Sequence, residues 1–308
     1  MPLFKKFPHA KSILALIVLT LTSYFLFKTL VTNYKEVNLS LRQISLPILS
    51  VSLIFFILYF NFRALSWQFI IKSLGKKIRV QDALAIWFLG ESTRYLPGKV
   101  WSFISRAYLA EQKGISKTVT LLSLIVELFV ILLVTATFSL PTLGTKIYPL
   151  LLNSDVKILL LTLPISIIFL LFVINTKKKV LLRTLTSFSS AKFLATDFLF
   201  AILCQILAWL FYGLAITILV INFTTGFSLS LILSNSIFSW LIGYASLVAP
   251  LGLGVRESAT AIIFGPILGN GTAVLIALVA RLIVSIAEVL NLGYWFIIRR
   301  SEGLRFEK

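Results

Sequence analysis

The sequence predicts an all-α polytopic integral membrane protein with about eight membrane segments. Mean hydropathy over the 308 residues is +0.99 and 58% of them are hydrophobic, which is far more than a water-soluble core requires. Apolar runs of about 20 residues, enough to cross ~30 Å of hydrocarbon as a helix, recur along the chain. Since no soluble stretch separates them, we expect residues 1–308 to form a single membrane domain without a soluble catalytic domain.

Six of the apolar runs are predicted to be full spans. The first follows Lys5, Lys6 and Lys11 as a signal peptide would, but it is long and no small-residue cleavage site comes after it. We therefore interpret it as an uncleaved span. The six predicted spans are residues 12–32, 46–71, 118–140, 156–175, 197–222 and 272–298.

Two further regions are interrupted by proline, glycine and charge, which predicts broken-helix or re-entrant hairpins. Residues 83–110 begin apolar and then contain "RYLPGKVW", and both of their flanks are basic. Residues 229–268 contain "APLGLGVRE", and no cation flanks them. Irregular backbone at membrane depth is tolerated only where it is buried in protein or lines a wet cavity. We expect both hairpins to face the protein interior and to enter from opposite sides.

The formal net charge of +18 is distributed as a topology signal, not as a nucleic-acid surface. With the N-terminus inside, eighteen cations fall in cytoplasmic segments and five outside, so both termini of this cell-membrane protein are predicted to be cytoplasmic. The inside cations are Lys5, Lys6, Lys11, Lys72, Lys76, Lys77, Arg79, Lys113, Lys117, Lys177, Lys178, Lys179, Arg183, Lys192, Arg299, Arg300, Arg305 and Lys308, and the outside cations are Lys28, Lys35, Arg42, Lys146 and Lys157.

The two halves of the chain resemble each other, as inverted-topology repeats do in many transporters. "GESTRYLP" from Gly90 matches "GYASLVAP" from Gly243 in its first and last residues, at an offset of 153 (243 − 90). In the next span, Glu127 then matches Arg281 at an offset of 154 (281 − 127). The order span, span, hairpin, span occurs twice with opposite orientation. The predicted repeat halves are residues 1–140 and 156–300.

The motifs "RYLPGKVW" and "PLGLGVRES", with Arg106, Gly114 and Glu127 after the first and Arg281 after the second, resemble the lysylphosphatidylglycerol synthase transmembrane-region family. Its best-known member is the flippase half of the multiple peptide resistance factor. The resemblance covers essentially the whole chain and implies movement of lipids or lipid-linked molecules between leaflets. In that factor a cytosolic aminoacyltransferase domain follows the membrane part. Because this chain ends at Lys308, we expect no aminoacyl-lipid synthase activity.

Ten charged residues lie at predicted membrane depth, where each charge costs at least ~2.5 to 3.5 kcal/mol. The cations beside the two breaks are the strongest candidates for binding an anion. Arg94 and Lys99 flank the Pro-Gly pair, where a half-helix that begins after the break directs free N–H groups toward an anion. Arg256 and Glu257 follow "PLGLG" in the same way.

The remaining charges have structural alternatives. Glu127 and Arg281 either pair with each other near the pseudo-twofold axis or contact substrate. Glu91 lies three residues before Arg94, at helical pairing distance, and Glu288 lies two turns after Arg281, where a structural role is favoured.

Arg63 is predicted to snorkel and Arg106 to lie near the membrane interface. Most of the tryptophans are interpreted as interfacial anchors. The candidate substrate-binding set is Arg94, Lys99, Arg256, Glu257, Arg281, Glu127, Glu91 and Arg106.

The residue inventory argues against an enzyme. The only histidine, His9, lies in the N-terminal tail, and the single cysteine, Cys204, lies in an apolar run, so no metal site or histidine-dependent nucleophile is expected. The three aspartates are widely separated and no P-loop is present, so neither a metal-dependent phosphotransferase nor an ATPase is predicted. We expect no cofactor.

These observations favour a flippase-like carrier of an anionic, phosphate-bearing lipid or lipid-linked saccharide. The alternative is a non-transporting, lipid-binding membrane scaffold that supports an envelope glycosyltransferase or lipid-modifying enzyme. Expected partners are the membrane lipid itself and a second copy of the chain or an envelope enzyme, but no nucleic acid.

Overall fold

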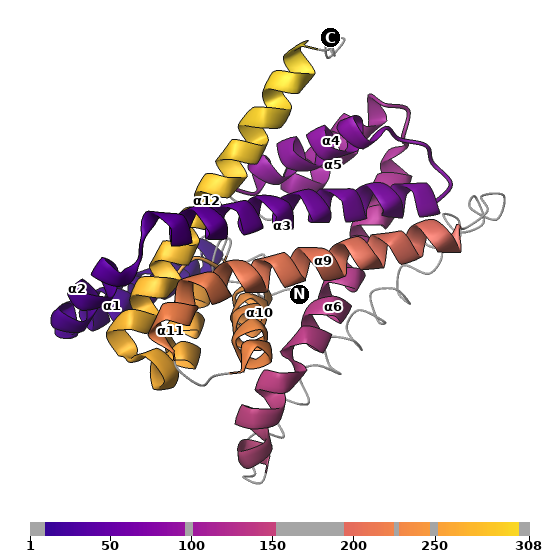
Figure 1. The fold of residues 1–308 in the computed structure, drawn as a ribbon. Coiled ribbons are helices and arrows are strands. Elements are labelled where there is room, and N and C mark those ends of the chain that lie inside the picture. The colour runs from indigo at the N-terminus through magenta and orange to yellow at the C-terminus, as the bar shows by residue number, and fades with distance from the viewer. Residues whose placement is uncertain (1–9, 96–100, 152–193, 225–227, 247–251, 302–308) are drawn as a thin grey trace.

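The regular structure of this chain is helical wherever the computed structural model describes it, which confirms the predicted all-α class (Figure 1). The described residues are 10–95, 101–151, 194–224, 228–246 and 252–301. Among them, four helices are long and apolar enough to cross a membrane: Leu46–Ser73, Lys117–Leu143, Ala195–Phe223 and Asn270–Ile297.

Helices occupy five of the six predicted spans, and the sixth, residues 156–175, lies outside the described residues. These helices are α1 (Ala10–Thr32), α3 (Leu46–Ser73), α6 (Lys117–Leu151), α9 (Ala195–Val220) and α12 (Asn270–Ser301).

Both interrupted regions form two short helices, as the breaks in the sequence predict. The first contains α4 (Val80–Ser92), a 3₁₀ turn η2 (Thr93–Tyr95) and α5 (Trp101–Glu111). The second contains α10 (Leu229–Ala245) and α11 (Val255–Leu268), and Gly254 before α11 has a φ of 78° that favours glycine. In each region the two helices pack against each other, so each is a helical hairpin.

Ion pairs connect the two ends of the first hairpin. Asp82, at the start of α4, accepts from Arg79 Nε at 2.8 Å and lies 2.9 Å from Lys113 Nζ, beyond the end of α5. These contacts hold the two ends of the hairpin together.

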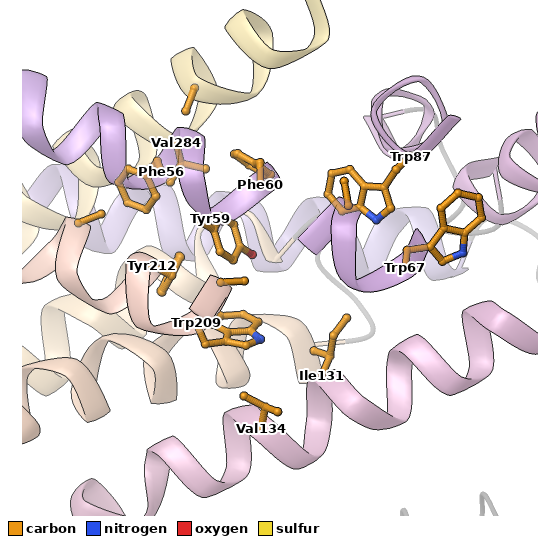
Figure 2. Close-up of a cluster of buried hydrophobic side chains, with 14 of the residues drawn as sticks. Phe56, Tyr59, Phe60, Trp67, Trp87, Ile131, Val134, Trp209, Tyr212 and Val284 are labelled. Carbon is orange, nitrogen blue, oxygen red and sulfur yellow. The ribbon is translucent and has the colours of Figure 1, made fainter. Parts of the chain in front are cut away.

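The centre of the fold is the antiparallel pair α3 and α9, which cross the middle of Figure 1 side by side. Ser52 donates to the Ala215 carbonyl at 2.9 Å and Ser66 to the Ala201 carbonyl at 2.8 Å. In both pairs the two residue numbers add to 267, so the antiparallel helices keep the same register between the two contacts. Aromatic side chains from α3, α4 and α9 fill the space around this pair, as Figure 2 shows.

Each hairpin packs against a span from the other half of the chain. The first hairpin contacts α12 through α4, whereas the second hairpin contacts α6 through α10. In both halves the hairpin also contacts the span before it and the span after it. Each hairpin is therefore enclosed partly by its own half and partly by the other.

A short helix that the sequence analysis did not predict, α2 (Tyr34–Gln43), follows α1. Glu36 of α2 accepts hydrogen bonds from the Thr272 amide at 2.8 Å and the Thr272 hydroxyl at 2.9 Å. An acidic group at this place satisfies a free N–H of the first turn of α12 and interacts favourably with the helix dipole.

Matching glycines let the arms of each hairpin close. A Cβ at Gly90 of α4 would collide with Arg106 Cγ of α5, and a Cβ at Gly243 of α10 would lie 2.7 Å from Arg256 Cβ and 3.1 Å from Arg256 Cα of α11. In both halves, the glycine of the first arm is the residue against which an arginine of the second arm packs.

We predict that Gly243→Ala lowers the free energy of unfolding by about 1 to 3 kcal/mol, the usual cost of overpacking, because the backbone of α11 has to move away. Gly293→Ala, within α12, is the matched control, since no atom of another described residue lies within 4 Å of the added Cβ. The control should instead stabilise by about 0.5 to 1 kcal/mol through helix propensity. Denaturant titration of both variants in detergent measures the difference, and equal stabilities would contradict the close packing.

Candidate functional site

A closed charge network lies between the first hairpin and α6. Arg106 of α5, only 2% exposed, donates to Glu127 Oε2 at 2.5 Å and to Glu91 Oε1 at 2.6 Å. The Trp87 indole donates to the other oxygen of Glu127 at 3.1 Å. Both carboxylates are thus held by short, charge-assisted hydrogen bonds.

Arg94 extends this network to the other half of the chain. It donates to Glu91 Oε2 at 3.0 Å and to Glu288 Oε2 of α12 at 2.5 Å. The prediction that Glu91 is a counter-ion of Arg94 is confirmed, and Glu288 has an ion pair consistent with the structural role favoured for it. Through Arg94, the first hairpin is tied to the last span.

The second hairpin carries a looser cluster. Glu257, 4% exposed, accepts from the Gly254 amide at 2.7 Å through Oε2 and so caps the start of α11. Its other oxygen lies 3.6 Å from Arg256 Nε and 3.7 Å from Arg281 Nε, and it accepts no hydrogen bond within the described part of the chain. One carboxylate oxygen is therefore flanked by two guanidinium groups at more than hydrogen-bond distance.

Of the two alternatives for Glu127 and Arg281, mutual pairing or substrate contact, the structure does not form the mutual pair. Glu127 is bound by Arg106, whereas Arg281 lies against Glu257. Each of these two residues therefore faces the second arm of the hairpin that precedes it in the sequence. The charges are reversed: in the first half the hairpin supplies the cation, and in the second half it supplies the anion.

Two arginines lie deeper than predicted. Arg106 was expected near the membrane interface, but the network with Glu91 and Glu127 holds it in the interior. Arg63 was expected to snorkel, but it is 7% exposed and its guanidinium lies over the rings of Tyr59 and Trp87, at 5.6 and 5.2 Å from their centroids. Aromatic faces and carboxylates stabilise these cations inside the protein.

The structure thus brings together two groups of the predicted site residues. Glu91, Arg94, Arg106 and Glu127 form the network of the first hairpin, and Arg256, Glu257 and Arg281 form the cluster of the second. Lys99 lies outside the described residues.

Sequence reasoning missed the role of the tryptophans. Trp67, Trp87 and Trp209 are buried in the core instead of anchoring the interface, and Trp87 binds Glu127 directly. A usable signal was the spacing of Trp87 and Glu91, four residues apart on α4, which places the indole and the carboxylate on one helix face. For metal ions, the described residues contain no cluster of three or more His, Cys, Asp or Glu side chains.

Comparison with known proteins gives one match. The family described as the lysylphosphatidylglycerol synthase TM region matches residues 12–290, which include both hairpins and both charge clusters. No curated protein matches the chain. Since the match spans most of the sequence, this multi-pass membrane protein belongs to the lysylphosphatidylglycerol synthase transmembrane-region family.

Proposed function

We propose that the protein is a flippase-like carrier that moves an anionic, phosphate-bearing lipid or lipid-linked saccharide between the leaflets of the cell membrane. The observation that carries this proposal is the cluster of the second hairpin, where Arg256 and Arg281 flank a single carboxylate oxygen at 3.6 and 3.7 Å. Both distances exceed that of a hydrogen bond, so the two guanidinium groups converge on this oxygen without being hydrogen-bonded to it.

The chemistry of this cluster suits a phosphate. Guanidinium groups bind phosphate bidentately, and the attraction of two unit charges at 4 Å rises from about 1 kcal/mol in water to about 4 kcal/mol at an effective dielectric of 20. In the network of the first hairpin the arginines already hold carboxylates at 2.5 to 3.0 Å. The first network is therefore proposed to support the hairpin, and the second cluster to bind the head group.

The packing of the two halves supports an inverted repeat with alternating access. Each hairpin contacts a span of the other half, α4 against α12 and α10 against α6. A movement of one half relative to the other would therefore act on both of these contacts. The basic residues Lys72, Arg79, Lys113 and Lys117 lie at the ends of α3, α4, α5 and α6, which supports a cytoplasmic location for these ends.

The test is reconstitution of the wild-type chain into liposomes that carry fluorescent phosphatidylglycerol, phosphatidylcholine or a polyprenyl phosphate in one leaflet. Loss of fluorescence on adding membrane-impermeant dithionite reports how much label has reached the outer leaflet. We expect protein-dependent exchange of an anionic lipid that protein-free and heat-treated samples lack. Absence of exchange for every label, with retained lipid binding, would favour the scaffold alternative.

A further inference from the structure

We propose a second head-group contact site at the crossing of α3 and α9, formed by Arg63, Tyr59, Gln205 and Trp209. The ligand is a phosphodiester that carries a hydroxylated head group. This inference rests on the proposed function, because it places a binding site between the two charge clusters, on the path that a moving head group would take.

The register of α3 and α9 brings the polar residues to one level. Ser52 contacts Ala215, and Ser66 contacts Ala201. In both pairs the residue numbers add to 267, so a residue n of α3 lies at the level of residue 267 − n of α9. Arg63 therefore lies opposite position 204, next to Gln205.

Several buried polar atoms at this level have no hydrogen-bond partner among the described residues. They are both amide atoms of Gln205, which is 0% exposed, together with Trp209 Nε1 and Arg63 Nε. Gln205 and Trp209 are four residues apart and lie on one face of α9. Buried polar groups in native proteins are nearly always paired, so this group of orphaned atoms indicates a missing polar partner.

Arg63 supplies the charge. It takes part in none of the ion pairs formed by the described residues, since Glu91 and Glu127 are held by Arg94 and Arg106. Among the described residues it makes one hydrogen bond, to the Tyr59 hydroxyl at 3.2 Å. Buried charges in proteins are usually paired, so a guanidinium that contacts no carboxylate directly is a candidate partner for an external anion.

Tyr59 joins Arg63 to α9. Its ring lies 5.5 Å from the ring of Trp209, and Figure 2 shows the Tyr59 hydroxyl and the Trp209 indole nitrogen on the side of the cluster away from Phe56. Arg63, Tyr59 and Trp209 thus contact one another in succession, and Gln205 lies one helical turn from Trp209 on the same face of α9.

This donor set identifies the ligand class. Guanidinium and indole groups only donate hydrogen bonds, so they suit the oxygens of a phosphodiester. The carboxamide can also accept a hydrogen bond, which suits a hydroxyl of a glycerol or sugar head group.

The set lies between the two charge clusters. Tyr59 contacts Tyr212 at a ring distance of 5.2 Å, and Tyr212 lies within electrostatic range of Arg256, Glu257 and Arg281. On its other side, Arg63 lies within electrostatic range of Glu91 and Glu127. A head group that leaves the cluster of the second hairpin toward the first hairpin meets this site.

The test is Gln205→Leu in the full-length chain, measured by native mass spectrometry with phosphatidylglycerol, with a diacylglycerol of the same acyl chains, and with inorganic phosphate as competitor. Loss of hydrogen bonds to a charged ligand should weaken phosphatidylglycerol binding about tenfold. Diacylglycerol binding should not change. Because Gln205 makes no side-chain hydrogen bond within the described part of the chain, the melting temperature should stay the same or rise.

Gln68→Leu is the matched control, because Gln68 is equally buried but its Nε2 donates to the Ile78 carbonyl at 3.2 Å. This variant should lose stability and keep its affinity for phosphatidylglycerol. Wild-type affinity in Gln205→Leu would overturn the site, and so would a lower melting temperature with unchanged affinity, which indicates a structural water. Displacement of the lipid by an equal concentration of inorganic phosphate would overturn the lipid assignment.

The leaflet-exchange assay separates this site from the proposed function. Exchange in the wild type that Gln205→Leu leaves unchanged would overturn the site and keep the carrier. Weakened binding in Gln205→Leu without any exchange in the wild type would keep the site and overturn the carrier.

Discussion

Arg106→Gln is expected to lower the free energy of unfolding by about 3 to 5 kcal/mol, the cost of leaving buried charges without their partner. Arg106 is the cation that two carboxylates share, Glu91 at 2.6 Å and Glu127 at 2.5 Å. Glu91 keeps Arg94 after the substitution, but of its partners among the described residues Glu127 keeps only the indole of Trp87. Denaturant titration of the purified protein in detergent measures the loss.

The double variant Arg106→Gln, Glu127→Gln should recover part of this loss, because the second change removes the unpaired charge. Lys117→Gln is the control, since Lys117 and Glu111 form an exposed pair, and such pairs contribute only ~0 to 1 kcal/mol. If Arg106→Gln were as stable as the control, the network would not support the hairpin.

Arg256→Gln should reduce the rate of anionic lipid exchange about 10- to 150-fold, which corresponds to the ~1.5 to 3 kcal/mol of a hydrogen bond to a charged group. Its effect on stability should be smaller than that of Arg106→Gln, because Arg256 lies 3.6 Å from its carboxylate and makes no short ion pair with another described residue. Arg256→Lys should restore only part of the rate, since a point charge does not reproduce the bidentate grip of a guanidinium.

The control for this series is Arg42→Gln, which removes an exposed cation of α2 and should leave exchange unchanged. Exchange is compared at equal amounts of reconstituted, monodisperse protein. Full activity in the Arg256→Gln, Arg281→Gln double variant would contradict a phosphate site between these arginines.

The sequence predicted the helices and their breaks better than the ionic contacts. Apolar length fixes a span, and proline and glycine mark where a helix must stop, so α3, α9 and both hairpins were readable. The partner of Glu127 depends on which helix face lies against α6, and neither hydropathy nor repeat alignment contains that information. Intrahelical spacing alone identified the contact of Glu91 with Arg94.

Two other features escaped prediction for physical reasons. Helix α2 has no long apolar run, because charged and polar residues alternate with its leucines, so hydropathy treats it as a loop. The central position of Arg63 depends on the crossing point of α3 and α9, and this is set by small-residue contacts such as Ser66 with Ala201. Its position in an apolar run predicted that burying Arg63 would cost free energy, but the run did not show where in the fold Arg63 would lie.

The attachment of α2 to α12 couples the two charge clusters mechanically. Thr272, bound by Glu36, lies in the first turn of a helix that also carries Arg281 and Glu288. A shift of α12 along its axis by one residue, about 1.5 Å, would displace Arg281 from Glu257 and Glu288 from Arg94 at the same time. The exposed Leu39 and Leu41 give α2 a surface on which surrounding lipid can act. Lateral pressure in the bilayer therefore has a route to both clusters through the hydrogen bonds of Glu36 with Thr272 and along α12, and the thickness of the membrane becomes a variable to which this protein can respond.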